Sequence, residues 1–93
     1  MDSQIRHNAE KHRFERQIHD GMLAAAYYRL ENGKFVFFDV EVPEFSGQGI
    51  GAALVQGVFN TLRAQGKRAV IKCSFMQNFL QTHPEYLDVV DAA

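Results

Sequence analysis

The hydrophobic residues of this chain change their spacing at one point, and a cluster of glycines marks the change. In residues 34–42, "KFVFFDVEV", the alternation predicts a strand with two faces: Val36, Phe38, Val40 and Val42 on one, and Phe35, Phe37, Asp39 and Glu41 on the other. In residues 51–65 the spacing becomes helical, with one apolar stripe of Leu54, Val55, Val58, Phe59 and Leu62. Gly47, Gly49 and Gly51 lie at the junction. A strand, a glycine turn and a helix must therefore follow one another.

Two further turn motifs divide the region before this junction into strands. Residues 13–20 alternate in polarity and predict a half-exposed strand that ends at Asp20-Gly21. Residues 22–30 are bounded by that turn and by Asn32-Gly33, the best short hairpin motif in the chain. We therefore expect antiparallel strands up to Pro43.

Three shorter elements follow the helix. Residues 68–73 predict a strand, and residues 74–83 a short helix capped by Ser74, with Phe75, Phe79 and Leu80 on one side. Residues 85–90 are expected to dock as a turn or an edge strand. The strand–helix–strand order implies a parallel pair of strands. The predicted fold class is α/β of the α+β type: a mixed, mostly antiparallel sheet, with a helix after the fourth strand, a parallel fifth strand and a short C-terminal helix.

Length and charge limit the classes of protein that fit. The 93 residues suffice for one domain, and the net charge of −1 argues against a nucleic-acid-binding protein. A single cysteine excludes an intramolecular disulfide, and no apolar run approaches the roughly 20 residues that span a bilayer. The polar N-terminus has no signal-peptide pattern, so we expect a cytoplasmic protein without membrane contact. The four histidines lack ligand spacing, so no metal site is predicted.

The glycine turn is the first candidate site. Several N–H groups at a helix N-terminus have no partner within the helix, and the helix dipole adds partial positive charge. The N–H groups of residues 48–52 could therefore hold a pyrophosphate. The dinucleotide fingerprint is incomplete, because Leu54 stands where its third glycine belongs. From spacing alone, an anion site and a plain strand-to-helix turn both remain open.

Two other positions carry reactive groups. Cys73 ends a predicted strand just before a helix, a position that favours the nucleophilic thiolate, although a lone cysteine is more often a buried structural residue. Asp39 and Glu41 are two apart on one strand, so both point the same way. A carboxylate there could act as a general base, and two solvated side chains are the alternative.

Three segments together, "EVPEFSGQGIGAALV", "KCSF" and "HPEYLDVV", resemble the GNAT superfamily of acetyl-CoA-dependent N-acetyltransferases, in particular its small single-domain members. The resemblance extends over residues 22–90. It implies a sheet whose fourth and fifth strands, residues 34–42 and 68–73, splay apart to hold acetyl-CoA. It also implies a catalytic role for Cys73 beside the thioester. The implied CoA contacts are Val40, Glu41 and Val42 for the pantetheine, Gly47, Gln48, Gly49, Ile50, Gly51 and Ala52 for the pyrophosphate, and Phe75, Asn78 and Phe79 along the CoA side.

The sequence also departs from the family pattern. Ser46 stands where the motif usually has Arg or Gln, and the loop after Val42 is one residue short. Asp39-Val40 replaces a frequent His-Thr, so a base role cannot be transferred to Asp39. Residues 1–12 match poorly and stay unassigned, with disorder as an open alternative. The chain has little room for the extra helices that build an acceptor pocket in larger relatives. We therefore expect an open acceptor site, or one completed by a second subunit or a protein partner.

Three functions follow from these observations. The first is an N-acetyltransferase for an unidentified amine, which uses either Glu41 as the base in direct transfer or Cys73 as an acetyl carrier. The second is a non-catalytic module that binds CoA or acyl-CoA. The third is a small α/β interaction domain whose glycines only shape a turn.

Overall fold

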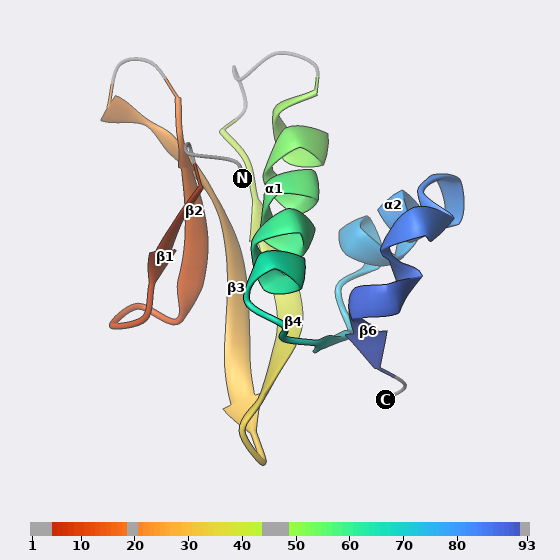
Figure 1. Ribbon diagram of the computed structural model, residues 1–93. Coiled ribbons are helices and arrows are strands. Elements are labelled where there is room, and N and C mark those ends of the chain that lie inside the picture. Colours follow the sequence, from red (N-terminus) through yellow and green to blue (C-terminus); the bar gives the residue numbers. More distant parts are fainter. Residues whose placement is uncertain (1–4, 19–20, 44–48, 92–93) are drawn as a thin grey trace.

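The computed structural model describes residues 5–18, 21–43 and 49–91, which form one mixed sheet with helices (Figure 1). The elements in chain order are β1 (Ile5–Asn8), β2 (Arg13–Gln17), β3 (Leu23–Glu31), β4 (Lys34–Glu41), α1 (Ile50–Ala64), β5 (Ala69–Ile71), α2 (Ser74–Thr82), a 3-10 helix (Pro84–Val89) and β6 (Val90–Asp91). The predicted order of strands, glycine turn, helix, strand and short helix is confirmed.

The strands lie in the sheet in the order in which they occur in the chain. Neighbours from β1 to β4 are antiparallel, whereas β5 pairs in parallel with β4 and β6 in parallel with β5. The segment after Pro84 therefore docks as both a turn and an edge strand. Within the unassigned residues 1–12, Ile5–Asn8 forms a strand that pairs with β2 over four positions.

The Asn32-Gly33 hairpin has the predicted geometry. The φ angles of Asn32 and Gly33 are 54° and 78°, and a two-residue turn of this hand suits the twist of the β3–β4 pair. At the β2–β3 hairpin, the N–H of Ile18 donates to the carbonyl oxygen of Met22 at 2.9 Å. Asp20 of the other predicted turn lies outside the described residues.

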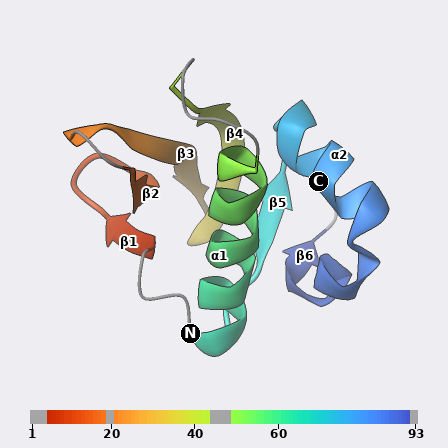
Figure 2. The same ribbon diagram turned by 90° about the horizontal axis from the view of Figure 1, so that it is seen from above.

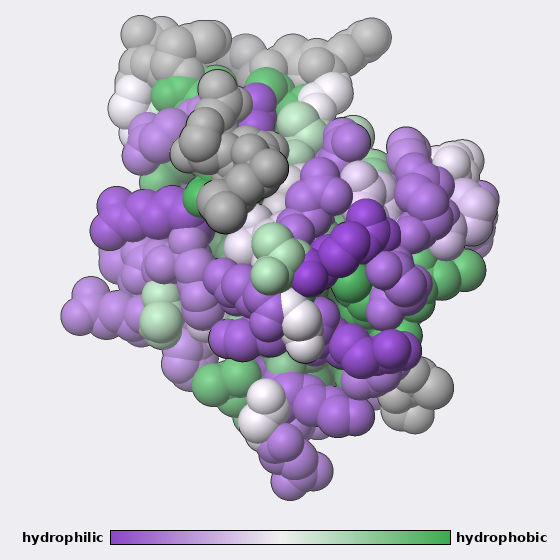
Figure 3. All heavy atoms as spheres, in the orientation of Figure 1, coloured by the Kyte–Doolittle hydropathy of each residue, from purple (hydrophilic) through white to green (hydrophobic). Residues whose placement is uncertain are grey.

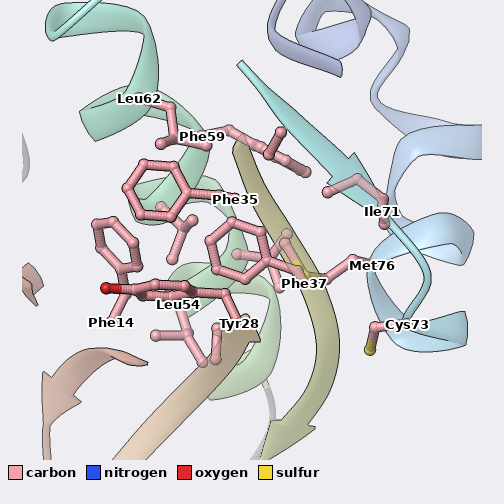
Figure 4. Packing of buried hydrophobic residues seen from close by; sticks show 14 of the residues in the cluster. Phe14, Tyr28, Phe35, Phe37, Leu54, Phe59, Leu62, Ile71, Cys73 and Met76 are labelled. Carbon is pink, nitrogen blue, oxygen red and sulfur yellow. The ribbon is translucent and has the colours of Figure 1, made fainter. Parts of the chain in front are cut away.

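The core lies between the sheet and α1, which covers one face of the strands (Figure 2). All five residues of the predicted helical stripe are fully buried, and the opposite side of α1 is mostly hydrophilic (Figure 3). The rings of Phe14, Tyr28, Phe35 and Phe37 extend from three strands toward the helix (Figure 4). Neighbouring rings are tilted or edge-on at centroid separations of 4.7–6.2 Å, as aromatic pairs prefer.

A β-bulge in β4 overturns the predicted faces of that strand. Tyr27 pairs with Asp39 and Tyr28 with Phe37, so Phe38 is an extra residue without a partner on β3. The bulge reverses the alternation: Phe35 and Phe37 lie in the core before it, and Val40 and Val42 pack against the core after it. Phe38 is 47 % exposed. Phe35 and Phe37 therefore do not share a face with Asp39 and Glu41.

The start of α2 also differs from its prediction. The N-cap residue is Cys73 and Ser74 is the first helical residue, with no side-chain hydrogen bond to the helix end. The buried residues of α2 are Met76 and Phe79, whereas Phe75 is 42 % exposed. The sequence pattern predicts that Phe75 lies on the buried side of α2, whereas the structure places Met76 there together with Phe79.

A polar network lies on the strands β1 to β3. Glu15 is buried, and its carboxylate accepts hydrogen bonds from Asn8 Nδ2 at 2.9 Å and Arg13 Nε at 2.5 Å. Burial acts to raise the pKa of Glu15, but these two hydrogen bonds, together with the charges of Arg13 and Arg6, hold the pKa below its ordinary value. Arg13 also donates to the hydroxyl of Tyr27 at 3.1 Å. The strand that was expected to be half exposed thus carries a buried, fully paired carboxylate.

Candidate active site

The candidate site begins where β4 and β5 separate. Their pairing runs from Phe35–Ala69 to Phe37–Ile71, and the N–H of Lys72 donates to the carbonyl oxygen of Phe37 at 2.8 Å. Beyond this bond, β5 has ended, whereas β4 continues to Glu41 paired with β3. Within the described residues, the other edge of residues 38–41 therefore has no strand partner. Backbone N–H and C=O groups on such an edge are available to an extended ligand.

The far end of β4 borders a cavity of about 530 Å³. Its lining residues are Leu23, Val40, Glu41, Val42 and Pro43. Val40, Glu41 and Val42, the three residues that the resemblance assigns to the pantetheine, thus border one common space. Glu41 is exposed there and Asp39 is partly buried.

The N-terminus of α1 has the features that an anion requires. Gly49 occupies the N-cap position with a φ of 86°, a conformation that favours glycine, and no side chain caps the helix. The first turn contains no acidic residue. The N–H groups at the start of a helix lack intrahelical acceptors, so those of Ile50, Gly51 and Ala52 are suited to an anion. Ser46, Gly47 and Gln48 lie outside the described residues.

Gly51 has a packing role that its place in the glycine cluster did not suggest. A Cβ atom at this position would lie 2.5 Å from Cζ of Phe75. The missing side chain therefore makes room for the Phe75 ring, which extends from α2 to the first turn of α1. The Phe75 ring, 42 % exposed, therefore lies between α2 and the first turn of α1.

Cys73 lies next to the point where the two strands separate. It follows Lys72, whose N–H makes the bond to Phe37, and its own carbonyl oxygen accepts from the N–H of Gln77 at 3.0 Å. The side chain is 6 % exposed, and Figure 4 shows its sulfur directed away from the aromatic rings of the core. The predicted position, between the end of a strand and the start of a helix, is confirmed.

Gln77 belongs to no motif that the sequence reveals. Its Nε2 donates to the carbonyl oxygen of Ile71 at 3.0 Å, which ties α2 to the last residue of β5. Together with the backbone bond from Gln77 to Cys73, this contact sets the geometry of the turn that carries the thiol. Glutamines on helices are common, and only the fold brings this one to a strand end.

The remaining residues predicted on α2 differ in their surroundings. Phe79 is buried against Phe59 and Tyr86, with centroid separations of 6.0 Å to both, and stacks on the ring of His83 at 4.0 Å. Its ring therefore supports the packing beneath α2. Asn78 is exposed on the same helix.

A metal site and a membrane-spanning helix are both absent from the part of the chain that the structure describes. No group of three histidine, cysteine or acidic side chains is arranged to hold a metal ion in the described part of the chain. Among the helices of residues 5–18, 21–43 and 49–91, none combines the length and apolarity needed to cross a bilayer.

Comparisons with known proteins show to which family this fold belongs. The family described as GCN5-related N-acetyl-transferase matches residues 13–89. The chain belongs to the GCN5-related N-acetyltransferase family. No curated protein sequence matches it.

A solved structure has the same fold. It is the NMR solution structure of a GCN5-like candidate N-acetyltransferase from Staphylococcus aureus, with a TM-score of 0.66 and 24 % sequence identity. The similarity covers 100 % of this chain and 93 % of that one. At this identity the match supports the fold, and the mixed sheet with its helices is of the GNAT type.

Proposed function

We propose that this protein is an N-acetyltransferase that transfers the acetyl group of acetyl-CoA to an amine. The observation that carries the proposal is the separation of β4 from β5 after Phe37. It leaves a free backbone edge on β4, and Cys73 directly follows the last bond between the strands. Family membership makes acetyl-CoA the expected donor.

In this proposal, acetyl-CoA lies along the free edge of β4. The N–H groups of Ile50, Gly51 and Ala52, with those of Gly47, Gln48 and Gly49, would hold the pyrophosphate. Val40, Glu41 and Val42 would bind the pantetheine arm through their backbone groups. Phe75 and Asn78 would contact the cofactor from α2, whereas the buried ring of Phe79 is better explained by packing.

Two routes for the acetyl group are consistent with the site. In direct transfer, Glu41 or a water molecule that it holds takes a proton from the amine, the amine nitrogen attacks the thioester carbonyl, and CoA leaves as the thiolate. In the covalent route, the Cys73 thiolate attacks the thioester, CoA leaves, and the acetyl group forms a new thioester on Sγ. The amine then attacks that thioester and releases the Cys73 thiolate.

Variants of the two candidate residues separate the routes. We expect mass spectrometry after incubation with acetyl-CoA to find one acetyl group on Cys73 if the covalent route operates, and Cys73→Ala to lose transfer to amines. No adduct, together with full turnover of Cys73→Ala, would remove the covalent route. Glu41→Gln is expected to lower kcat in direct transfer, and Glu10→Gln on the exposed β1–β2 turn is the matched control.

A second function is favoured by the connection between β1 and β2. Only residues 9–12 join these strands, so no helix inserted between them could form an acceptor pocket. A module that binds CoA without transferring acetyl groups would fit this geometry. Calorimetric binding of CoA without transfer to any amine in a broad panel would support that function. Transfer only at concentrations where the chain self-associates would instead support an acceptor site completed by a second subunit.

A further inference from the structure

A second cavity lies at the end of the sheet opposite to the candidate active site. Its volume is about 510 Å³, within the range of roughly 300–1,000 Å³ that is usual for small-molecule sites. Residues from β1, β3, the β3–β4 turn, β4, the α1–β5 connection and β6 meet around it. No residue of the candidate active site contributes to its lining.

The wall of this cavity is apolar and aromatic. Tyr28 and Phe35 are buried, and their rings meet edge-on at a centroid separation of 4.7 Å. Leu30 lines the same space and is 52 % exposed, so its side chain is accessible to a ligand. These three side chains offer a surface for the apolar body of a ligand.

The rim carries more positive than negative charge. Lys34, Lys67 and Arg68 line it together with one carboxylate, that of Asp91. Asp91 is already shared: Lys34 Nζ lies 3.2 Å from one of its oxygens and Arg68 Nε lies 2.6 Å from the other.

Lys67 is the cation that remains. Within the described residues it has no carboxylate partner, and its Nζ lies 5.5 Å from the centroid of the Phe35 ring. Its position is set by the end of α1, where Gly66 adopts a φ of 67° and the Lys67 N–H donates to the carbonyl oxygen of Leu62 at 2.9 Å. An ammonium group is thus held at the edge of an apolar wall.

A polar pair lies beside that wall. Nε2 of His7 and the hydroxyl of Tyr28 are hydrogen-bonded at 2.6 Å, and both residues line the cavity. Partial burial lowers the pKa of His7, and the charge of Lys67 lowers it further, which favours the neutral imidazole at pH 7. Among the described residues that line this side of the cavity, Lys67 is therefore the cation without a carboxylate partner.

We propose that this cavity binds a small organic carboxylate with an apolar or aromatic body. The carboxylate pairs with Lys67, and the body lies on Leu30, Tyr28 and Phe35. Lys67 is the cation of this rim that has no carboxylate partner within the described residues, so its ammonium group is the one available to a ligand carboxylate, and the apolar wall suits the apolar body of the ligand. The site is separate from the acetyl-CoA site and does not depend on the proposed activity.

The test uses 3-phenylpropanoate as the probe and its neutral amide, 3-phenylpropanamide, as the matched ligand. We expect the carboxylate to cause saturable chemical-shift changes in the millimolar range at the amides of Leu30, Gly33 and Lys67. The amide should bind about tenfold more weakly, as loss of a hydrogen bond to a charged group predicts. Equal binding of the two ligands, or shifts that do not saturate, would overturn the proposal.

Variants of the full chain locate the probe. Lys67→Met should weaken carboxylate binding by about tenfold, whereas Lys11→Met, on the exposed β1–β2 turn, should not change it. Leu30→Ala, at a half-exposed position that the fold tolerates, should weaken both ligands alike. Unchanged binding in Lys67→Met, or displacement of the probe by CoA, would assign the probe elsewhere and contradict the proposal.

Discussion

The two halves of β4 differ in surroundings far more than in composition. Residues 35–37 pair with β3 on one side and β5 on the other, and all three are buried. Residues 38–41 follow at once and contain Phe38 and Val40; within the described residues, 39–41 pair with β3 alone and Phe38 has no partner on that strand. The first half is the centre of the sheet, and the second half is an edge beside the candidate active site.

The difference shows how one strand serves stability and binding together. The bulge at Phe38 adds one residue on β4 directly after Phe37, the last residue of β4 that pairs with β5. Burial of Phe37 holds the strand in place. The edge of residues 38–41 that faces away from β3 can therefore lack a strand partner, within the described residues, without loss of the fold. The following predictions test this division from the largest effect to the smallest.

The adjacent phenylalanines on either side of the division should differ most. Phe37→Ala removes a fully buried ring and should lower the free energy of unfolding by about 3–5 kcal/mol. Phe38→Ala removes a half-exposed ring whose main partner is the guanidinium of Arg29 at 5.9 Å, and should cost only about 0.5–1 kcal/mol. Urea denaturation of both variants measures the contrast, and equal losses would contradict the bulge.

Gly51 tests the contact across the opening. Gly51→Ala should destabilise the protein by about 1 kcal/mol, because the half-exposed Phe75 ring must swing away from the new methyl group. In a Phe75→Ala background the clash is absent, and the same substitution should be neutral or stabilising by up to about 1 kcal/mol, as alanine is the better helix former. A double-mutant cycle measures this change of sign. Equal effects in both backgrounds would show that the ring lies elsewhere.

Gln77 tests how the thiol is positioned. Gln77→Ala leaves the carbonyl oxygen of Ile71 without its side-chain donor and should cost about 1 kcal/mol. Because the same helix end carries Cys73, the loosened turn should also speed its alkylation by iodoacetamide. Gln81→Ala, at an exposed position of α2, is the control. A faster reaction in the control, or an unchanged rate in Gln77→Ala, would argue against this role.

The smallest effect concerns pH at the other end of the sheet. The pKa of His7 is lowered in the folded protein, first by partial burial and then by Lys67. In the unfolded chain His7 has its ordinary pKa of about 6.5, so below that pH the unfolded chain binds more protons than the folded protein. The contribution of His7 to the free energy of unfolding is therefore complete above about pH 6.5 and is lost as the pH falls through the lower pKa of the folded protein. Denaturation between pH 7 and pH 5 should show a shallower decline in His7→Gln than in the unchanged protein. Identical slopes would contradict the shift.

Patterns that depend on near neighbours could be predicted from the sequence. The five-residue stripe of α1 and the Asn32-Gly33 turn were identified correctly, since helical periodicity and positive φ angles are properties of short segments. The family resemblance was also confirmed, together with the separation of strands that it implied. The predicted faces of β4 were wrong because the strand is mostly apolar, so the alternation of its residues does not reveal the extra residue of the bulge.

The sequence by itself determined the order of the elements, the glycine cluster and the place of Cys73 between a strand and a helix. The tertiary structure decided which face each residue of β4 presents, what fills the space at Gly51, and which glutamine supports the thiol. It also brought Lys67 to the ring of Phe35, which lies far away in the chain. Each of these depends on contacts between distant segments, whose geometry is set by how the sheet, α1 and α2 pack together and by no local pattern of residues.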